Sequence, residues 1–330
     1  MRLCKGRKKY PFCKEIHKLF LSSIYFSKSK LYNSIVNLRG FIMKKIVILG
    51  CENSHANSFL EFIKDNPKYS DVEVLGVYSE EVEAAQKLSQ TYGVKVMNTY
   101  DEAVGQVDGV IVTARNGDNH YKYAKPYIES GVPMFIDKPV TVSKSDALAL
   151  AKACQKAGVR VTGGSSIVHE EVVKTLKKER EENVGGKTLG GMVRCPVSME
   201  NAYGNFFFYS EHLVGVMSEI FGYYPKSVQA FQKGDVITVL FRYEEYDTVG
   251  IYTEGHYNYY AARSFEEGVH GEPIVLGDCF KLEFDEFYGL LCGEEQRRSY
   301  QDFIAPVFVL NAIQRSLDSG KEEEVNNYTV

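Results

Sequence analysis

The chain has 330 residues, of which 44% are hydrophobic and 25% charged, and its formal net charge is −4. This is the composition of an ordinary globular protein, with a length that suits about two domains. No apolar run approaches the ~20 residues needed to cross a membrane, and the seven cysteines form no C-x-x-C pair, which indicates reduced thiols in the cytosol and no zinc site.

Residues 1–42 are strongly basic. They contain ten Lys or Arg residues and one acid, Glu15, so their net charge is +9 and the rest of the chain carries −13. Such an extension could be a nucleic-acid arm or a targeting peptide. Alternatively, Met43, which stands directly before KKIVILG, is the true start of the protein. We expect residues 1–42 to lie outside the fold.

The first predicted element is a strand at Lys44–Gly50, charged at its start, apolar in its middle and ended by glycine. This pattern is typical of the opening strand of a dinucleotide-binding βαβ unit, in which the following turn reads G-x-G-x-x-G. Here the turn reads GCENSHA. Only Gly50 is in place, while Glu52 stands at the second glycine position and His55 at the third.

Two features of this turn bear on the binding of a diphosphate. The carboxylate of Glu52 would bring a negative charge close to it and weaken binding, unless the side chain turns away. In contrast, Asn53 or Ser54 could cap a helix that we predict at Ala56–Lys64, and the N-terminus of that helix would favour an anion.

A second strand is predicted at Val72–Tyr78, and an acid just beyond such a strand holds the ribose hydroxyls of a dinucleotide. The chain offers Ser79, followed by Glu80 and Glu81. Because no arginine stands there, a 2′-phosphate has no obvious partner, and NAD is favoured over NADP. The alternative is that both glutamates only favour the start of a helix at Val82–Tyr92.

Strands and helices continue to alternate up to residue 165. The predicted strands are Val94–Met97, Gly109–Thr113, Val132–Ile136 and Val159–Thr162, and the predicted helical segments are Tyr100–Val104, Tyr121–Ser130 and Ser143–Ala157. This alternation predicts a doubly wound parallel sheet of the Rossmann type, in a domain of residues 43–165.

Ligands of such a sheet bind outside the carboxyl ends of its strands. At that edge, the strand ending in Thr113 is followed by a polar loop that includes Asn116 and His120. His120 is either a structural neighbour of the next helix start or part of the rim of a cofactor site.

The strand Val132–Ile136 delivers Asp137, Lys138 and Pro139 to the same edge. Proline disfavours the α conformation in the residue before it, so Lys138 should be held extended, with its ammonium aimed at one spot. The alternative is a surface lysine paired with Asp137, an interaction worth under ~1 kcal/mol.

The run GVPMFIDKPVTVSKSDALALAKACQKAGVRV resembles the stretch around the Glu-Lys-Pro signature of the Gfo/Idh/MocA family, named after glucose-fructose oxidoreductase and inositol dehydrogenase. KKIVILG, the helix leading to Gly93 and the closing GKEEEV resemble that family too. The similarity covers about Met43 to the end and is strongest over Gly109–Val161. Several branches of the family carry aspartate where others have glutamate, so Asp137-Lys138-Pro139 is an acceptable variant of the signature. The turn at Gly50, in contrast, departs from the family pattern.

Residues 166–330 are predicted to form a C-terminal α+β domain for substrate binding and oligomerisation, with an open, largely antiparallel sheet. The predicted strands are Gly191–Val197, Ser227–Gln232, Val236–Tyr243, Thr248–Glu254 and Tyr257–Phe265, and the predicted helices are Glu170–Glu182, Leu213–Phe221 and Ser299–Leu317.

Four tyrosines gather on this predicted sheet, namely Tyr252, Tyr257, Tyr259 and Tyr260. An aromatic face could bind a sugar ring or a nucleic-acid base, but it more often packs against helices or a second subunit. Because no basic pattern surrounds the tyrosines, we expect no nucleic-acid partner. We expect instead a homo-oligomer formed through the sheet.

His212 follows an aromatic run in a place that resembles the D-x-x-x-H motif of the family, in which aspartate and histidine assist the lysine. Here the position of the aspartate is taken by Phe208. Glu211 stands beside His212 but would point to a different face of a helix, so it does not replace the missing acid.

The resemblance implies a cytoplasmic NAD(P)-dependent oxidoreductase that acts on a hydroxyl group of a small sugar-like or cyclitol-like substrate. In that reading Lys138 would hydrogen-bond the developing oxyanion and His212 would take or return the proton. The residues implied in cofactor binding are Gly50, Asn53, Ser54, His55, Ser79, Glu80, Thr113, Asn116, His120, Asp137 and Lys138.

Two alternatives stay open at this point. One is a binding or sensor protein on the same scaffold that has lost the dinucleotide. The other is a hydrolase that uses NAD or a metal in the same cleft, which is disfavoured because the sequence shows no metal-ligand cluster.

Overall fold

The computed structural model describes residues 43–325 and 328–330. Lys44–Val330 form one compact unit, and the predictions made for residues 1–42 lie outside the described part of the chain. None of the described helices is long and apolar enough to span a membrane.

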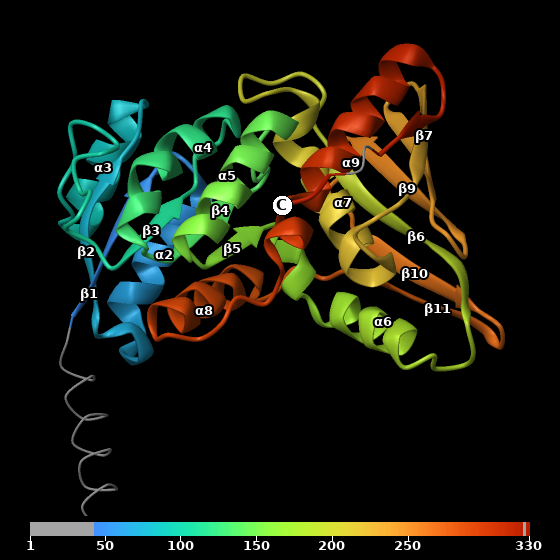
Figure 1. The fold of residues 1–330 in the computed structure, drawn as a ribbon, viewed down its shortest axis with the longest axis horizontal. Coiled ribbons are helices and arrows are strands. Elements are labelled where there is room, and N and C mark those ends of the chain that lie inside the picture. Colours follow the sequence, from blue (N-terminus) through green and yellow to red (C-terminus); the bar gives the residue numbers. More distant parts are fainter. Residues whose placement is uncertain (1–42, 326–327) are drawn as a thin grey trace, which may run out of the picture. The chain divides into compact units, whose positions relative to one another are not determined.

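The first half of this unit contains a five-stranded parallel sheet (Figure 1). Its strands are β1 (Lys44–Leu49), β2 (Val72–Tyr78), β3 (Gly109–Val112), β4 (Met134–Asp137) and β5 (Val161–Gly164), in the spatial order β2-β1-β3-β4-β5. The predicted parallel sheet is confirmed. The strand predicted at Val94–Met97 is reduced to a single parallel bridge between Val77 and Val96, at the β2 edge.

Helices accompany these strands as the alternation predicted. They are α2 (Ser54–Asp65), α3 (Val82–Tyr92), α4 (Asp118–Ala124) and α5 (Lys144–Ala157), with 3-10 segments at Pro67–Tyr69 and Lys125–Ser130. The helix predicted at Tyr121–Ser130 begins earlier and tightens into a 3-10 segment, because Pro126 lacks the amide hydrogen that an α-helix needs there.

The first sheet is buried on both faces. Along β1, Val47 and Leu49 belong to one apolar cluster, while Ile46 and Ile48 belong to another, as expected when successive side chains point to opposite faces. The second of these clusters also takes in Phe284 and Phe287. They come from α8 (Cys279–Leu291), a helix that the sequence analysis did not predict.

The second half contains a seven-stranded sheet, with the order β11-β10-β6-β9-β8-β7-β12. Its strands are β6 (Thr188–Val197), β7 (Ser227–Lys233), β8 (Val236–Arg242), β9 (Asp247–Glu254), β10 (Tyr260–Phe265), β11 (Gly268–Pro273) and β12 (Glu323–Glu324). Only β6 and β9 pair in parallel among these neighbours, so the sheet is mixed and largely antiparallel, as predicted. The strands β11 and β12 were not predicted.

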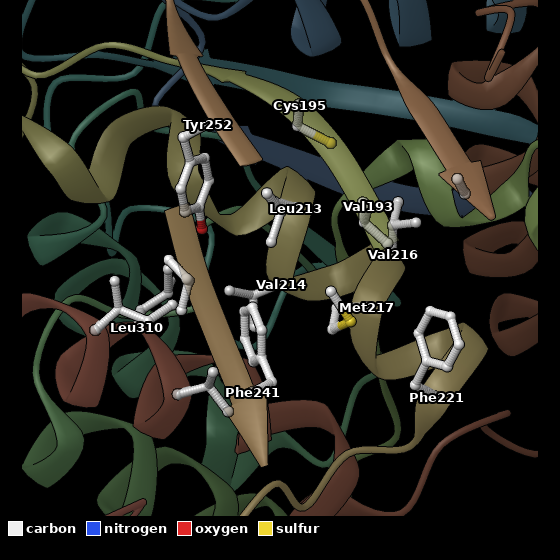
Figure 2. Packing of buried hydrophobic residues seen from close by; sticks show 14 of the residues in the cluster. Val193, Cys195, Leu213, Val214, Val216, Met217, Phe221, Phe241, Tyr252 and Leu310 are labelled. Carbon is white, nitrogen blue, oxygen red and sulfur yellow. The ribbon is translucent and has the colours of Figure 1, made fainter. Parts of the chain in front are cut away.

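Three helices accompany this sheet, namely α6 (Glu171–Glu181), α7 (Phe206–Phe221) and α9 (Tyr300–Ser319). Figure 2 shows Leu213 and Met217 of α7 in the core that they share with Phe241 of β8 and Tyr252 of β9. Helix α7 begins at Phe206 instead of the predicted Leu213, because the aromatic residues before Leu213 continue the helix and add its first turns to this packing. The helix is therefore long enough to reach from the second core to the first sheet.

The turn after β1 offers a test of the close packing at this edge. Gly50 has φ +75°, and a Cβ placed on it would come within 2.3 Å of Cα of Ala114. Gly50→Ala should therefore lower the free energy of unfolding by about 2–4 kcal/mol, from backbone strain and from the clash together.

Gly93→Ala is the matched control for this substitution. Gly93 has a similar φ of +73°, but a Cβ there would meet nothing within 4 Å. Only the strain remains, so we expect a loss of about 1 kcal/mol. Urea unfolding of both variants measures the difference, and equal losses would contradict a close approach at Gly50.

Candidate functional site

A cavity of about 810 Å³ lies at the carboxyl edge of the first sheet and extends to α7. Lys138 and His212, the two residues predicted to perform chemistry, both line it. Asn53, Ser54 and His55, from the turn after β1 and the start of α2, line it too. The fold thus brings together side chains from three separate parts of the sequence.

Lys138 follows β4 directly and is only 5% exposed. Its ammonium donates a hydrogen bond to the carbonyl oxygen of Phe208 at 3.2 Å and lies 4.7 Å from the centre of the Phe208 ring. The backbone N–H of Lys138, not its ammonium, donates to Asp137 Oδ1 at 2.7 Å. The alternative of a surface lysine paired with Asp137 is therefore wrong, because the side chain is buried against α7.

His212 lies on α7, across the cavity from the start of α2. Its Nδ1 and the hydroxyl of Ser165 share a hydrogen bond of 2.8 Å, and its ring packs 4.7 Å from that of Tyr209. Burial, together with the nearby charge of Lys138, holds the pKa of His212 well below its usual range. The imidazole is therefore neutral at pH 7 and able to accept a proton.

Phe208 stands where the family motif has aspartate, and what it offers Lys138 is its backbone carbonyl. Glu211 is fully enclosed, and its Oε2 accepts the backbone N–H of Val140 at 3.1 Å. Burial raises the pKa of Glu211 to about 7. This carboxyl group thus supports the backbone just behind Lys138, on a different side of α7 from the cavity, as the helix geometry predicted.

The carboxylate of Glu52 does not point into open space. Its Oε1 accepts the backbone N–H of Arg115 at 2.9 Å, and its Oε2 accepts the hydroxyl of Ser79 at 2.7 Å. Ser79 follows β2 and Arg115 follows β3, so the carboxylate spans the carboxyl ends of the strands on either side of β1. Its charge is held by protein donors at the edge where a dinucleotide would lie.

Asn53 and Ser54 do not cap α2 as expected. Asn53 is the N-cap residue, but its side chain makes no capping hydrogen bond. Instead, its amide Nδ2 donates to Asp137 Oδ2 at 2.7 Å, and its Oδ1 accepts the hydroxyl of Ser54 at 3.2 Å. The carboxylate of Asp137 is buried and needs donors from the protein, and the amide N–H of Asn53 is one of them.

Three further predicted residues make contacts within the protein at this edge. Glu80 forms an exposed ion pair with Lys122 at 2.9 Å. Asn116 accepts an N–H at the start of α4, and Thr113 donates its hydroxyl to the carbonyl of Gly50 at 3.1 Å. Glu80 and Asn116 are thus at the rim, while Thr113 is buried under the first turn.

His120 is completely buried beside the same edge. Its two ring nitrogens lie 2.6 Å from the carbonyl oxygen of Pro139 and 2.8 Å from that of Ala114. Burial lowers the pKa of His120, so the ring is neutral and can donate to only one of the two carbonyls. These contacts support a structural role for His120 over a place in the cofactor rim, since they tie the loop after β3 to the segment after β4.

A family model described as oxidoreductase family, NAD-binding Rossmann fold, matches residues 44–165. The chain thus resembles the Gfo/Idh/MocA oxidoreductase family over these residues. Glucose-6-phosphate 3-dehydrogenase of Bacillus subtilis (strain 168) is 27% identical to it over 150 residues. That match spans 44% of this chain and 41% of the enzyme, less than half of the length of either.

Solved structures share the fold across both halves of this chain. GenD2 from gentamicin A biosynthesis, in complex with NAD, has a TM-score of 0.75 at 16% identity, covering 87% of this chain and 97% of its own. A putative myo-inositol dehydrogenase from Sinorhizobium meliloti 1021 has a TM-score of 0.73 at 15% identity, covering 86% and 100%. At these identities the similarity is one of fold.

The contribution of α8 to the site was not predicted from the sequence. Phe280 lines the cavity, and Glu283 contacts His55 behind it. A helical spacing of Phe280, Phe284 and Phe287 was the available signal. Among the described residues, no group of three His, Cys, Asp or Glu side chains is placed to hold a metal ion.

Two buried glutamates of α7 should affect stability in opposite directions as pH changes. Because burial raises the pKa of Glu211 in the folded protein from its ordinary value of 4.5 to about 7, the folded protein loses stability as pH rises from 4.5 to 7. Glu211→Gln should therefore raise the free energy of unfolding at pH 8 by roughly 2–3 kcal/mol and leave it unchanged at pH 4.

Glu219→Gln is the control of opposite sign. Arg297 lies 2.7 Å from Glu219, and the pKa of Glu219 is lowered to about 2. The ionised carboxylate of Glu219 stabilises the fold fully above pH 4.5, and this contribution is lost as pH falls towards 2. The Glu219→Gln variant should therefore be destabilised at pH 8 by roughly 2–3 kcal/mol. Urea unfolding of both variants at pH 4 and pH 8 measures the two effects. If both substitutions changed the free energy of unfolding in the same direction at pH 8, the opposite pKa shifts of the two glutamates would be refuted.

Proposed function

We propose that this protein is an NAD-dependent oxidoreductase that moves a hydride between the cofactor and a hydroxyl or carbonyl group of a small sugar-like or cyclitol-like substrate. One observation supports this above the others. The ammonium of Lys138 and the neutral imidazole of His212 line one cavity, at the carboxyl edge of a sheet whose family model is NAD-binding. These are a hydrogen-bond donor and a base, the two groups that oxidation of an alcohol needs.

The residues at the sheet edge fit the cofactor. Gly50 has no side chain where the turn approaches the next strand, and Asn53 and Ser54 at the start of α2 face the cavity. The helix N-terminus and Arg115 would hold the diphosphate, and the carboxylate of Glu52 is bonded to Ser79 instead of facing it. When bound, NAD would supply the hydride acceptor.

The chain's own groups would then act on the substrate. Lys138 donates a hydrogen bond to the substrate oxygen and stabilises the negative charge that grows on it as hydride leaves carbon. His212 accepts the hydroxyl proton on its free nitrogen, Nε2, while Ser165 holds Nδ1. In the reverse direction, the protonated His212 returns that proton to the carbonyl oxygen.

The walls of the cavity support a ring-shaped substrate. They include the aromatic side chains Tyr203, Phe208, Tyr209, Tyr259 and Phe280. Flat aromatic faces suit the apolar faces of a sugar or cyclitol ring, and the tyrosine hydroxyls suit its polar rim. Two similar proteins carry names of this class, a glucose-6-phosphate 3-dehydrogenase and a putative myo-inositol dehydrogenase.

We propose NAD rather than NADP as the cofactor. Glu80 and the carboxylate of Glu52 lie at the end of β2, where a 2′-phosphate would have to bind. Two negative groups repel a phosphate, and among the described residues no arginine follows that strand directly.

A sensor that has lost the dinucleotide is the alternative function, and it predicts that NADH does not bind.

The homo-oligomer and the cytoplasmic location stay predictions. For the former, Met192, Val249 and Leu240 lie in register on adjacent strands and are partly exposed, while the intervening residues face the helices. We propose that a second copy of the chain covers this face of the sheet, which light scattering of the full chain would test.

Replacing the lysine separates chemistry from binding. Lys138→Met keeps the apolar bulk but removes the hydrogen-bond donor, so turnover should fall about a thousandfold while NADH still binds. The emission of NADH itself reports binding, because the chain contains no tryptophan. Lys152→Met, an exposed lysine on α5, is the control and should keep full turnover. Unchanged turnover in Lys138→Met would exclude the proposed role.

Removing the charge of Glu52 tests the fit of the altered turn. The carboxylate lies at the edge where the diphosphate would bind, so Glu52→Gln should lower the dissociation constant of NADH roughly tenfold. Glu61→Gln, which removes an exposed charge from the same helix region, should leave the constant unchanged. A weaker affinity for NADH in Glu52→Gln would mean that the carboxylate binds the cofactor instead of repelling it.

A further inference from the structure

A cluster of ionisable side chains lies buried behind the cavity. Nδ1 of His55 is 3.4 Å from Asp137 Oδ2, and its Nε2 is 3.1 Å from Glu283 Oε1. The exposed fractions are 3% for His55, 0% for Asp137 and 1% for Glu283. An imidazole at the third glycine position of the turn is thus enclosed between two carboxylates, one from β4 and one from α8.

A protonated imidazole would offset one of the two negative charges of this cluster. A buried carboxylate without a compensating partner is costly, and here two of them face one ring. The two carboxylates raise the pKa of His55 even though its complete burial opposes the charge. For Glu283 burial dominates and raises the pKa to about 7, although the nearby His55 opposes that rise.

Other ionisable groups also surround the pair. They are Lys138 beside the cavity, His212 on α7, Glu286 one turn further along α8, and Cys279 at the start of α8. Neither carboxylate oxygen of Glu283 makes an aligned hydrogen bond within the described structure, so its partner is the charge of His55. The ring of Phe280, which lines the cavity together with His55, packs 4.1 Å from the imidazole.

The cluster is connected to the reactive lysine through Asp137. One oxygen of Asp137 accepts the backbone N–H of Lys138 at 2.7 Å, and the other receives Asn53 and faces His55. The position of the Asp137 carboxylate therefore fixes the backbone from which the ammonium extends. Anything that holds this carboxylate also holds Lys138.

We propose that His55 and Glu283 are positioning residues for Lys138. The protonated imidazole, held by Glu283, locks the Asp137 carboxylate in the orientation that receives the Lys138 N–H. This gives the histidine at the third glycine position a purpose within the reaction. The catalytic consequence rests on the proposed oxidoreductase function, whereas the physical link does not.

The link can be measured in the full chain without cofactor or substrate. The His55 ring, assigned in nitrogen-15 spectra by comparison with His55→Gln, should titrate above the ordinary value for histidine. In Glu283→Gln, which keeps the shape but not the charge, its pKa should fall by about one unit. Exchange of the Lys138 amide hydrogen should become about tenfold faster in the same variant, because its acceptor is less firmly held.

Asp285→Asn is the matched control, since it removes a carboxylate from the outer side of α8, where Lys281 pairs with it. It should change neither the His55 titration nor the exchange of the Lys138 amide. An unchanged His55 pKa or an unchanged exchange rate in Glu283→Gln would overturn the proposal. If Glu283→Gln does not fold, the wild-type protein still decides the matter. A His55 pKa below the ordinary value for histidine would by itself overturn the proposal.

Kinetics then test the consequence for the reaction. Glu283→Gln should lower kcat about tenfold with the NADH dissociation constant unchanged, and Glu283→Asp should restore part of the loss. If Glu283→Gln raised KM and left kcat unchanged, a role of Glu283 in positioning Lys138 would be contradicted. If the wild-type chain neither binds NADH nor turns over a sugar or cyclitol, the proposed function fails, while the spectra still decide the link between His55 and Lys138.

Discussion

The candidate site depends on one buried carboxylate at the end of β4. Asp137 has no exposure to solvent, so each of its oxygens must be satisfied by the protein. It receives the backbone N–H of Lys138 and the side-chain amide of Asn53, and it lies 3.4 Å from Nδ1 of His55. The carboxylate thereby joins Lys138 to the turn after β1, and the geometry of both follows from this requirement.

This constraint accounts for the altered glycine turn. Each side chain that departs from the glycine pattern has acquired a partner within the fold: Glu52 bonds with Ser79 and the backbone of Arg115, while His55 lies between Asp137 and Glu283. Gly50 alone could not change, because a Cβ would meet the backbone of Ala114. The turn is thus a coherent set of contacts around a retained lysine, which is why we favour a working oxidoreductase over a scaffold that has lost its cofactor.

Much of the fold could be predicted from the sequence, because the strands of the first sheet are short apolar runs bounded by glycine, and the second sheet shows period-two patterns. The strand end and the family resemblance also singled out Lys138 and His212, which line one cavity, while their catalytic roles stay predictions. The contacts of His55 could not be foreseen, since Glu283 lies 228 residues further along the chain on a helix without a clear start signal. The backbone role of Phe208 likewise depends on the longer α7, which local sequence did not reveal.

The central claim is that the cavity beside Lys138 is the hydride-transfer end of a dinucleotide site. Calorimetric titration of the full chain with NADH tests it most directly, because the chain has no tryptophan whose quenching could report binding. We predict saturable binding of one NADH per chain. The absence of any binding heat at millimolar NADH, at two temperatures, would contradict the account and favour a sensor on the same scaffold.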